Sequence, residues 1–281
     1  MIQDHTTTQL FFSTWPGAIL AFVFGLLIGS FLNVCIHRWP RGRSVVKPRS
    51  HCVRCRKPIA WYDNIPVLSY LLLRGRCRYC GRHISARYPT VELVTAIAFF
   101  AFVWKLGLTL AAFKMCLFAA MLIALIFTDL EKRLLPDELT LGGTLLGLAI
   151  SVFVPLRDET AMGLLWILGL DLSGRAQSIG ASAMGAFLPT FFLWGGGWLY
   201  LKLRHREGLG LGDVKLMMMI GAFLGLQSSL TTLLVGSLTG SVVSLIYIKI
   251  AKKDAATYQL PFGTFLGLAA LAVTIYTTFA Y

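Results

Sequence analysis

Charged residues are scarce in this sequence of 281 residues. Asp, Glu, Lys and Arg make up 14% of the chain, whereas a soluble domain averages about 25%. Apolar residues make up 56%, and the mean hydropathy is +0.70. Runs of about 20 apolar residues with few charges are long enough for a helix to cross the hydrocarbon of a bilayer. The composition argues strongly against a water-soluble globular protein and predicts a helical membrane protein.

Several familiar signatures are missing. The chain has no His-Glu-x-x-His motif, which argues against a zinc metalloprotease. It has no glycine-rich dinucleotide-binding loop, so no Rossmann-type domain is expected. Residues 1–14 contain no Lys or Arg, so the first apolar run is expected to remain as an anchor rather than act as a cleaved signal peptide. No soluble domain combines basic residues with base-stacking aromatics, so no nucleic-acid partner is predicted.

Apolar runs predict an all-α polytopic membrane protein with about eight transmembrane helices. Their approximate ranges are 17–36, 90–108, 111–129, 138–155, 181–203, 213–227, 229–250 and 261–280. The apolar stretch 161–170 is too short to cross a bilayer. The segment 156–180 around it carries no pattern that predicts a role.

The distribution of basic residues predicts the orientation. Thirteen of the 26 Lys and Arg residues lie between Arg38 and Arg87, in the one long polar segment. The positive-inside rule weighs the residues close to span ends, and it places this segment in the cytoplasm and the N-terminus outside. The net charge of +13 is therefore explained by topology. The chain divides into an outside N-terminus with the first span (1–36), a cytoplasmic segment (37–89) and a membrane core of seven further spans (90–281).

The cytoplasmic segment contains two CxxC pairs, Cys52 with Cys55 and Cys77 with Cys80. Four thiolates at this spacing suit tetrahedral zinc, and structural disulfides are not expected in a reducing cytoplasm. A closed shell of four sulfurs leaves no open coordination position, so such a zinc would be structural. It would fold a small module with few apolar residues between the first two spans.

Carboxylates at the ends of spans are the strongest candidates for chemistry. A charge at the centre of a membrane helix costs about 2.5–3.5 kcal/mol on insertion scales, so such residues are functional candidates. Asp129 directly follows an apolar run, and Asp213 ends a Gly-Leu-Gly-Asp sequence and begins another run. The predicted orientation places both at the cytoplasmic edge of the membrane. Each also has a structural alternative, because Asp213 could cap a helix and Asp129 could pair with Lys132 or Arg133.

Two aspartates at the same depth form a useful pair. Hydrolysis of a peptide bond needs a base to take a proton from water and an acid to protonate the leaving amine. Neighbouring carboxylates share one proton and can supply both. Gly210 and Gly212 would let a substrate backbone approach closely, because they have no side chain. The sequence therefore predicts a membrane aspartic peptidase that uses Asp129 and Asp213.

These motifs together resemble the type IV prepilin peptidases, the bifunctional leader peptidases and N-methyltransferases of pilus and type II secretion systems, which are GxGD membrane aspartic proteases. The resemblance extends from about Gly25 to Phe265. Besides the CxxC pairs it rests on Gly29-Ser-Phe-Leu-Asn-Val34, Asp63-Asn-Ile-Pro66, Val91-Glu-Leu93, Leu135-Pro-Asp137, Gly210-Leu-Gly-Asp-Val-Lys215 and Pro261-Phe-Gly263.

The resemblance implies a detailed activity. Such an enzyme cleaves the basic leader of type IV prepilins and pseudopilins after a glycine, at the cytoplasmic face of the bacterial inner membrane. It then methylates the new N-terminal amine with S-adenosylmethionine. Asp129 and Asp213 match the catalytic aspartates, and Asp137 and Lys215 join the two glycines in shaping the site. The four residues that match the zinc ligands are Cys52, Cys55, Cys77 and Cys80.

The methyltransferase residues stay open. The candidates are polar residues in or next to the cytoplasmic segment: Asn33, Asp63, Asn64 and Glu92. Asn33 could equally form a hydrogen bond between helices, and Glu92 could be a favourable charge at a helix N-terminus.

Other classes remain as alternatives. One is a peptidase that lacks methylation. A second is a transporter in which the two aspartates relay protons, although this leaves the cysteine pairs unexplained. A third is a membrane adaptor whose zinc module binds partners. The pilins that are processed, the oligomeric state and the geometry of the aspartate pair cannot be predicted from the sequence.

Overall fold

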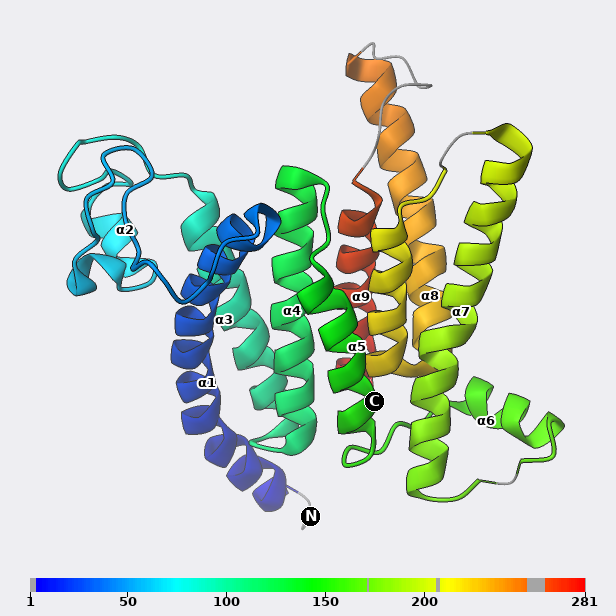
Figure 1. The fold of residues 1–281 in the computed structure, drawn as a ribbon. Helices are drawn as coiled ribbons and strands as arrows, with labels where there is room; N and C mark the ends of the chain where they lie inside the picture. The colour runs from blue at the N-terminus through cyan, green and yellow to red at the C-terminus, as the bar shows by residue number, and fades with distance from the viewer. Residues whose placement is uncertain (1–3, 171, 206–207, 252–260, 281) are drawn as a thin grey trace. The chain divides into compact units, whose positions relative to one another are not determined.

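The computed structural model describes residues 4–170, 172–205, 208–251 and 261–280, and within these ranges it contains helices but no strand (Figure 1). The long helices are α1 (Asp4–Arg38), α3 (Arg87–Leu106), α4 (Leu110–Lys132), α5 (Asp137–Ser151), α7 (Arg175–Arg204), α8 (Leu211–Ala251) and α9 (Phe262–Ala280). The shorter ones are α2 (Leu68–Leu72), α6 (Glu159–Ile167), and the 3-10 helices η1 (Trp39–Arg41) and η2 (Trp61–Asn64).

Six helical segments in the described residues are long and apolar enough to cross a membrane. They are Trp15–Arg41, Arg87–Leu106, Leu110–Lys132, Arg175–Arg204, Leu211–Ala251 and Phe262–Ala280. Helix α5, with only 15 residues, is not among these six segments. Helix α8 is included as one segment, although its backbone leaves helical geometry at Gly225 (φ 84, ψ −173). The prediction of an all-helical polytopic protein is confirmed, while the number of eight spans stays a prediction.

The chain forms two compact units, residues 1–124 (unit 1) and 125–281 (unit 2), and the division falls within α4. In unit 1, helices α1 and α3 pack through a Gly-x-x-x-Gly sequence. A Cβ atom at Gly25 would lie 2.6 Å from Cα of Ala96, and one at Gly29 would lie 2.6 Å from Cα of Glu92. Small residues at this spacing let helix backbones touch. This contact brings Glu92 against α1.

Helix α8 in unit 2 reverses direction at Gly225, so its yellow first half and orange second half lie side by side (Figure 1). In a straight helix, Asp213 and Gly236 would be about 34 Å apart. Instead both contact the first turns of α9. A Cβ at Gly263 would lie 3.0 Å from Asp213 Oδ1, and a Cβ at Gly236 would lie 2.9 Å from a methyl carbon of Leu266. The reversal at Gly225 lies within the predicted span 213–227, three residues before the break predicted at position 228.

Asp158 stabilises this reversal from the segment for which the sequence predicted no role. Its side chain is 3% exposed. The Oδ2 atom accepts a hydrogen bond from the backbone N–H of Gln227 at 2.9 Å, and Oδ1 accepts one from Ala161 at 2.9 Å. Asp158 therefore caps α6 and the second half of α8 at the same time, satisfying N–H groups that have no partner within their own helices.

Candidate active site and metal centre

Asp129 lies near the end of α4 and is held by the start of α9. Its side chain is buried, with 4% of the residue exposed. The backbone N–H and the hydroxyl of Thr264 both donate to Asp129 Oδ2, at 2.6 and 2.7 Å. Backbone N–H groups in the first turn of a helix have no partner within the helix and attract negative charge. Two donors therefore fix one carboxylate oxygen and leave Oδ1 available for other contacts.

Asp213 faces the same point of α9. A Cβ atom at Gly263 would lie 3.0 Å from Asp213 Oδ1 and 3.2 Å from Asp129 Oδ2. Two atoms within these distances of one point are at most 6.2 Å apart, the sum of the two values. The structure thus brings together the two aspartates that the sequence singled out, 84 positions apart in the chain. Only glycine leaves room for both carboxylates at this position.

The other predicted site-shaping residues surround this pair. A Cβ at Gly210 would lie 3.4 Å from Asp213 Oδ2, and one at Gly212 would lie 3.3 Å from Leu135. Lys215 donates to both carboxylate oxygens of Asp137 at 2.8 and 2.9 Å. This ion pair joins the starts of α5 and α8, so the Leu-Pro-Asp and Gly-Leu-Gly-Asp motifs form one structure. Both side chains are partly exposed, so the pair contributes to stability only weakly, about 0–1 kcal/mol.

The four predicted metal ligands form a cluster in unit 1. The Sγ atoms of Cys52, Cys55, Cys77 and Cys80 all lie within 4.8 Å of one another, and all four cysteines are free. The Cys52 and Cys80 sulfurs are 3.9 Å apart. Zinc–sulfur bonds of about 2.3 Å place the sulfurs of a regular tetrahedron about 3.8 Å apart, whereas a disulfide needs about 2.05 Å. The cluster has the dimensions of a four-sulfur metal site.

Neighbouring thiols affect one another's ionisation. Burial opposes ionisation of Cys52, but hydrogen bonds from the backbone at Cys55 and Arg54 and from nearby thiols lower its pKa to about 7. A backbone hydrogen bond at Arg82 favours the thiolate of Cys80, yet burial and the other three thiols raise its pKa to about 11. A cation among the sulfurs would favour the thiolate form of all four.

The two CxxC pairs lie in equivalent turns. The backbone N–H of Cys52 donates to Lys57 O at 3.0 Å, and that of Cys77 donates to Arg82 O at 2.9 Å. The fourth residue after each of these cysteines has positive φ: Arg56 (φ 58) in the first turn and Gly81 (φ 65) in the second. Glycine adopts this conformation without penalty, whereas a side chain disfavours it by roughly 1–2 kcal/mol. The first turn is therefore strained where the second is not.

Replacing Arg56 with glycine is expected to stabilise the cysteine module by about 1 kcal/mol, because it removes the left-handed strain. The measurement is the midpoint of metal loss during chelator titration of the purified protein. Arg54→Gly, two positions earlier and without positive φ, is the control, and it should not stabilise the module. Equal or lower metal retention in Arg56→Gly than in wild type would contradict this prediction.

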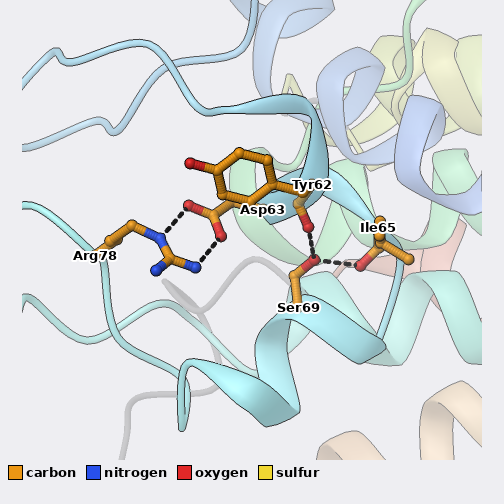
Figure 2. Close-up of polar contacts among 5 residues, drawn as sticks. All are labelled: Tyr62, Asp63, Ile65, Ser69 and Arg78. Atoms are coloured by element: carbon orange, nitrogen blue, oxygen red, sulfur yellow. Dashed lines mark hydrogen bonds and ion pairs between the residues drawn. The ribbon is translucent and has the colours of Figure 1, made fainter.

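Asp63 and Asn64 lie in η2, close to the cysteine module. Arg78, between the second pair of cysteines, donates to Asp63 from Nε at 2.7 Å and from Nη2 at 2.6 Å (Figure 2). These hydrogen bonds, with the guanidinium charge, hold the pKa of Asp63 below its usual value. Ser69 extends the network by donating to the carbonyl oxygens of Tyr62 and Ile65 at 3.1 and 2.7 Å. Asp63 therefore ties η2 to the second CxxC turn.

Asn33 and Glu92 lie at the contact of α1 with α3. Asn33 donates to Gly29 O at 3.3 Å and to Tyr88 O at 3.0 Å, which is a hydrogen bond between helices. Glu92 accepts from the backbone N–H of Val67 at 2.7 Å. The hydrogen bond from Asn33 to Tyr88 is the contact between helices that the sequence analysis gave as the alternative to a methyltransferase role. Glu92 instead holds a loop outside its own helix.

Two residues of the aspartate site were missed from the sequence. Gly263 was quoted in the Pro-Phe-Gly motif without a role, and Thr264 was not singled out. The available signal was the position of Thr264 directly after this motif, at the start of the last apolar run. A threonine at a helix start is usually a local cap, so the sequence alone could not point to a contact with Asp129.

Comparisons with known proteins show the family to which the chain is related. Residues 23–106 match the bacterial peptidase A24 N-terminal domain, and residues 116–245 match the type IV leader peptidase family. A prepilin leader peptidase/N-methyltransferase of Aeromonas hydrophila is 37% identical over 290 residues, covering 94% of this chain and 90% of that protein. One of Pseudomonas putida is 34% identical, covering 89% of this chain and 87% of that protein.

A further relative with the same name, from Myxococcus xanthus, is 41% identical over 231 residues, covering 82% of this chain but 63% of that protein. No solved structure matched. Asp129, Asp213 and the residues around them fall within the second matched region, apart from the start of α9, and the four cysteines fall within the first. On the strength of these matches over nearly its whole length, the chain belongs to the type IV leader peptidase family.

Proposed function

We propose that this protein cleaves the leader of type IV prepilins and pseudopilins and then methylates the new N-terminus. The observation that carries the peptidase activity is the meeting of Asp129 and Asp213 at Gly263, with their nearest oxygens 3.2 and 3.0 Å from one point. The names of the relatives support both activities.

The geometry suits hydrolysis by a pair of carboxylates. One carboxylate takes a proton from the attacking water while the other protonates the leaving amine, and the pair shares one proton between cycles. Thr264 fixes one oxygen of Asp129, so Oδ1 is the atom that would face the water. Gly210 beside Asp213 leaves space for an extended substrate backbone.

The place of the aspartates on their helices supports a membrane-anchored substrate. Asp129 lies in the last turn of the apolar helix α4, and Asp213 lies in the first turn of α8. A pilin anchored by an apolar helix presents its cleavage site at such a membrane edge without leaving the lipid. The positive-inside rule supports the cytoplasmic face of the bacterial inner membrane for this edge, with an outside N-terminus. The carboxylates would also favour a basic leader, which is cleaved after a glycine.

Methyl transfer requires S-adenosylmethionine as donor. We assign it to unit 1, which holds Asn33, Asp63, Asn64 and Glu92 and lies outside the aspartate site. A structural zinc bound by the four cysteines fits the separation of the sulfurs and would fold residues 37–89 around it. A saturated tetrahedral shell offers no position for substrate, so the zinc takes no part in either reaction.

Metal removal should disrupt the cysteine module but not the aspartate site. Wild-type protein is expected to contain one zinc per chain by elemental mass spectrometry, and Cys55→Ser to contain almost none, because three sulfurs bind much more weakly. Trypsin should then cut the module rapidly at its arginines. Cys116→Ser, outside the cluster, is the control and should keep its zinc. Full zinc occupancy in Cys55→Ser would contradict the site.

The experiment for the proposed function uses purified protein in detergent, a prepilin with a basic leader and S-adenosylmethionine. Mass spectrometry of the product reads leader removal and addition of one methyl group together. Cleavage with methylation supports the whole proposal, and cleavage alone leaves a peptidase without methyl transfer. If no prepilin is cleaved and the protein in vesicles carries protons, the two aspartates belong to a transporter.

A further inference from the structure

Unit 1 contains a cavity of about 330 Å³ between α1 and the cytoplasmic segment. Its α1 wall includes Ser30, Phe31 and Val34, and the facing walls include Arg49, Ser50 and Asn64. We propose that this cavity binds S-adenosylmethionine. The inference rests on the methyltransferase half of the proposed function and names the site that would serve it.

The cavity uses the face of α1 opposite to the one that packs on α3. On a helical projection at 100° per residue, Gly25 and Gly29, which touch α3, lie about 180° from the cavity-lining residues Val34 and Arg38. The cavity is therefore not part of the packing between the two helices. It lies where the polar segment folds back over the cytoplasmic end of the first span.

Arg38 lines the cavity and holds the loop that forms one of its walls. It is 8% exposed, and its guanidinium donates to the carbonyl oxygens of Ser44, Val45 and Pro48 at 3.0, 3.4 and 2.7 Å. An arginine with several donors can hold three carbonyl groups of a loop that has no secondary structure of its own. The loop that carries Arg49 and Ser50 is thereby fixed against α1.

Glu92 builds the opposite wall. Its carboxylate accepts from the backbone N–H of Val67 at 2.7 Å, directly after the cavity-lining Pro66. Val67 has φ 60 and ψ −49, and the N–H of Leu68 donates to Pro66 O, which together form a tight γ-turn. This turn is rare and strained, and the strain of a β-branched residue persists only where the surroundings enforce it. Such strain is characteristic of binding sites.

The lining matches the chemistry of the methyl donor. Small-molecule sites are mostly apolar with a few placed polar groups and occupy about 300–1,000 Å³. Phe31 and Val34 offer an apolar surface to a nucleobase, Asn64 offers amide donors and acceptors, and Arg49 offers a cation to the amino-acid carboxylate. The buried Glu92 also has a hydrogen bond with the cavity residue Ser30, so a carboxylate next to the lining would favour the positive charge of the donor.

The reaction itself needs no oxidant and no further group. The lone pair of the deprotonated N-terminal amine forms a bond to the methyl carbon while the carbon–sulfur bond breaks and its electron pair stays on sulfur. The methylated amine releases one proton to water, and S-adenosylhomocysteine remains. The cavity residues would bind and orient the donor, and all of them lie in unit 1.

The test compares two valine-to-phenylalanine variants on the same helix. Val34→Phe places a ring in the cavity, whereas Val23→Phe changes a side chain that is 50% exposed and lies outside it. Equilibrium dialysis of the full-length protein in detergent with radiolabelled S-adenosylmethionine should give binding at least about 10-fold weaker for Val34→Phe and unchanged for Val23→Phe. Asn64→Ala, which leaves the apolar packing intact, should weaken binding roughly 10-fold.

Two further readouts separate the possible failures. Ultraviolet cross-linking of the radiolabelled donor should label peptides from residues 27–66, and Val34→Phe should cleave prepilin at the wild-type rate. Wild-type affinity in both Val34→Phe and Asn64→Ala would overturn the cavity assignment. If wild type binds the donor here but methylates no cleaved pilin, the cavity stands as a binding site and the proposed methyltransferase function fails instead.

Discussion

Asp129→Asn and Asp213→Asn are each expected to lower the rate of prepilin cleavage by at least about 1,000-fold. Asparagine keeps the size of the side chain, and in Asp129→Asn its carbonyl oxygen can still accept from Thr264. It cannot take up or release a proton, however, so neither water activation nor protonation of the leaving amine can proceed through it. The measurement is the initial rate of leader removal in detergent, followed by mass spectrometry.

Glu138→Gln is the matched control for these variants. Glu138 is an exposed carboxylate in the first turn of α5, next to Asp137, and its loss should leave the rate unchanged. The two asparagine variants should also unfold at the wild-type temperature and should still methylate a pilin peptide supplied without its leader, because the residues assigned to methyl transfer lie in unit 1. A wild-type cleavage rate in either variant would show that the aspartates are structural and would refute the mechanism.

The sequence predicts the chemistry of this protein better than its geometry. Asp129 and Asp213 stand out because carboxylates are costly at membrane helix ends, and the CxxC pairs stand out because four thiols at this spacing suit a tetrahedral metal. Both signals are local. The contact between Asp129 and Thr264 spans 135 positions and depends on how α4 and α9 pack, which no local pattern records.

The reversal of α8 shows the same limit. The sequence divides this helix at position 228, where Gln227, Ser228 and Ser229 interrupt the apolar residues, but it does not show that the chain turns back on itself at Gly225. The reversal is enforced from outside the helix by Asp158, whose carboxylate accepts from Gln227. A single aspartate in a loop is usually an ordinary local cap, and Asp158 also performs that role for α6. Its second contact becomes visible only in the folded chain.

Close backbone packing of α7 against the first half of α8 leads to the second large effect, in Gly185→Ala. A Cβ at Gly185 would lie 2.6 Å from the carbonyl oxygen of Gly221, and Ser182 donates to Ala222 O at 2.6 Å in the same interface. Backbone atoms cannot move aside as a side chain can, so the methyl group must separate the helices. The expected destabilisation is about 3 kcal/mol or more, at the upper end for overpacking.

Gly195→Ala in the same helix is the control for steric contact between α7 and α8, because no atom from another helix lies within 4 Å of a Cβ built there. Alanine is favoured over glycine in a helix by up to about 1 kcal/mol, so this variant should unfold at or above the wild-type temperature. Thermal unfolding in detergent should therefore shift in opposite directions for the two substitutions. Gly185→Ala should also lose prepilin cleavage, because Asp213 begins the helix that is displaced. Equal unfolding temperatures for Gly185→Ala and Gly195→Ala would show that the two backbones are not in contact.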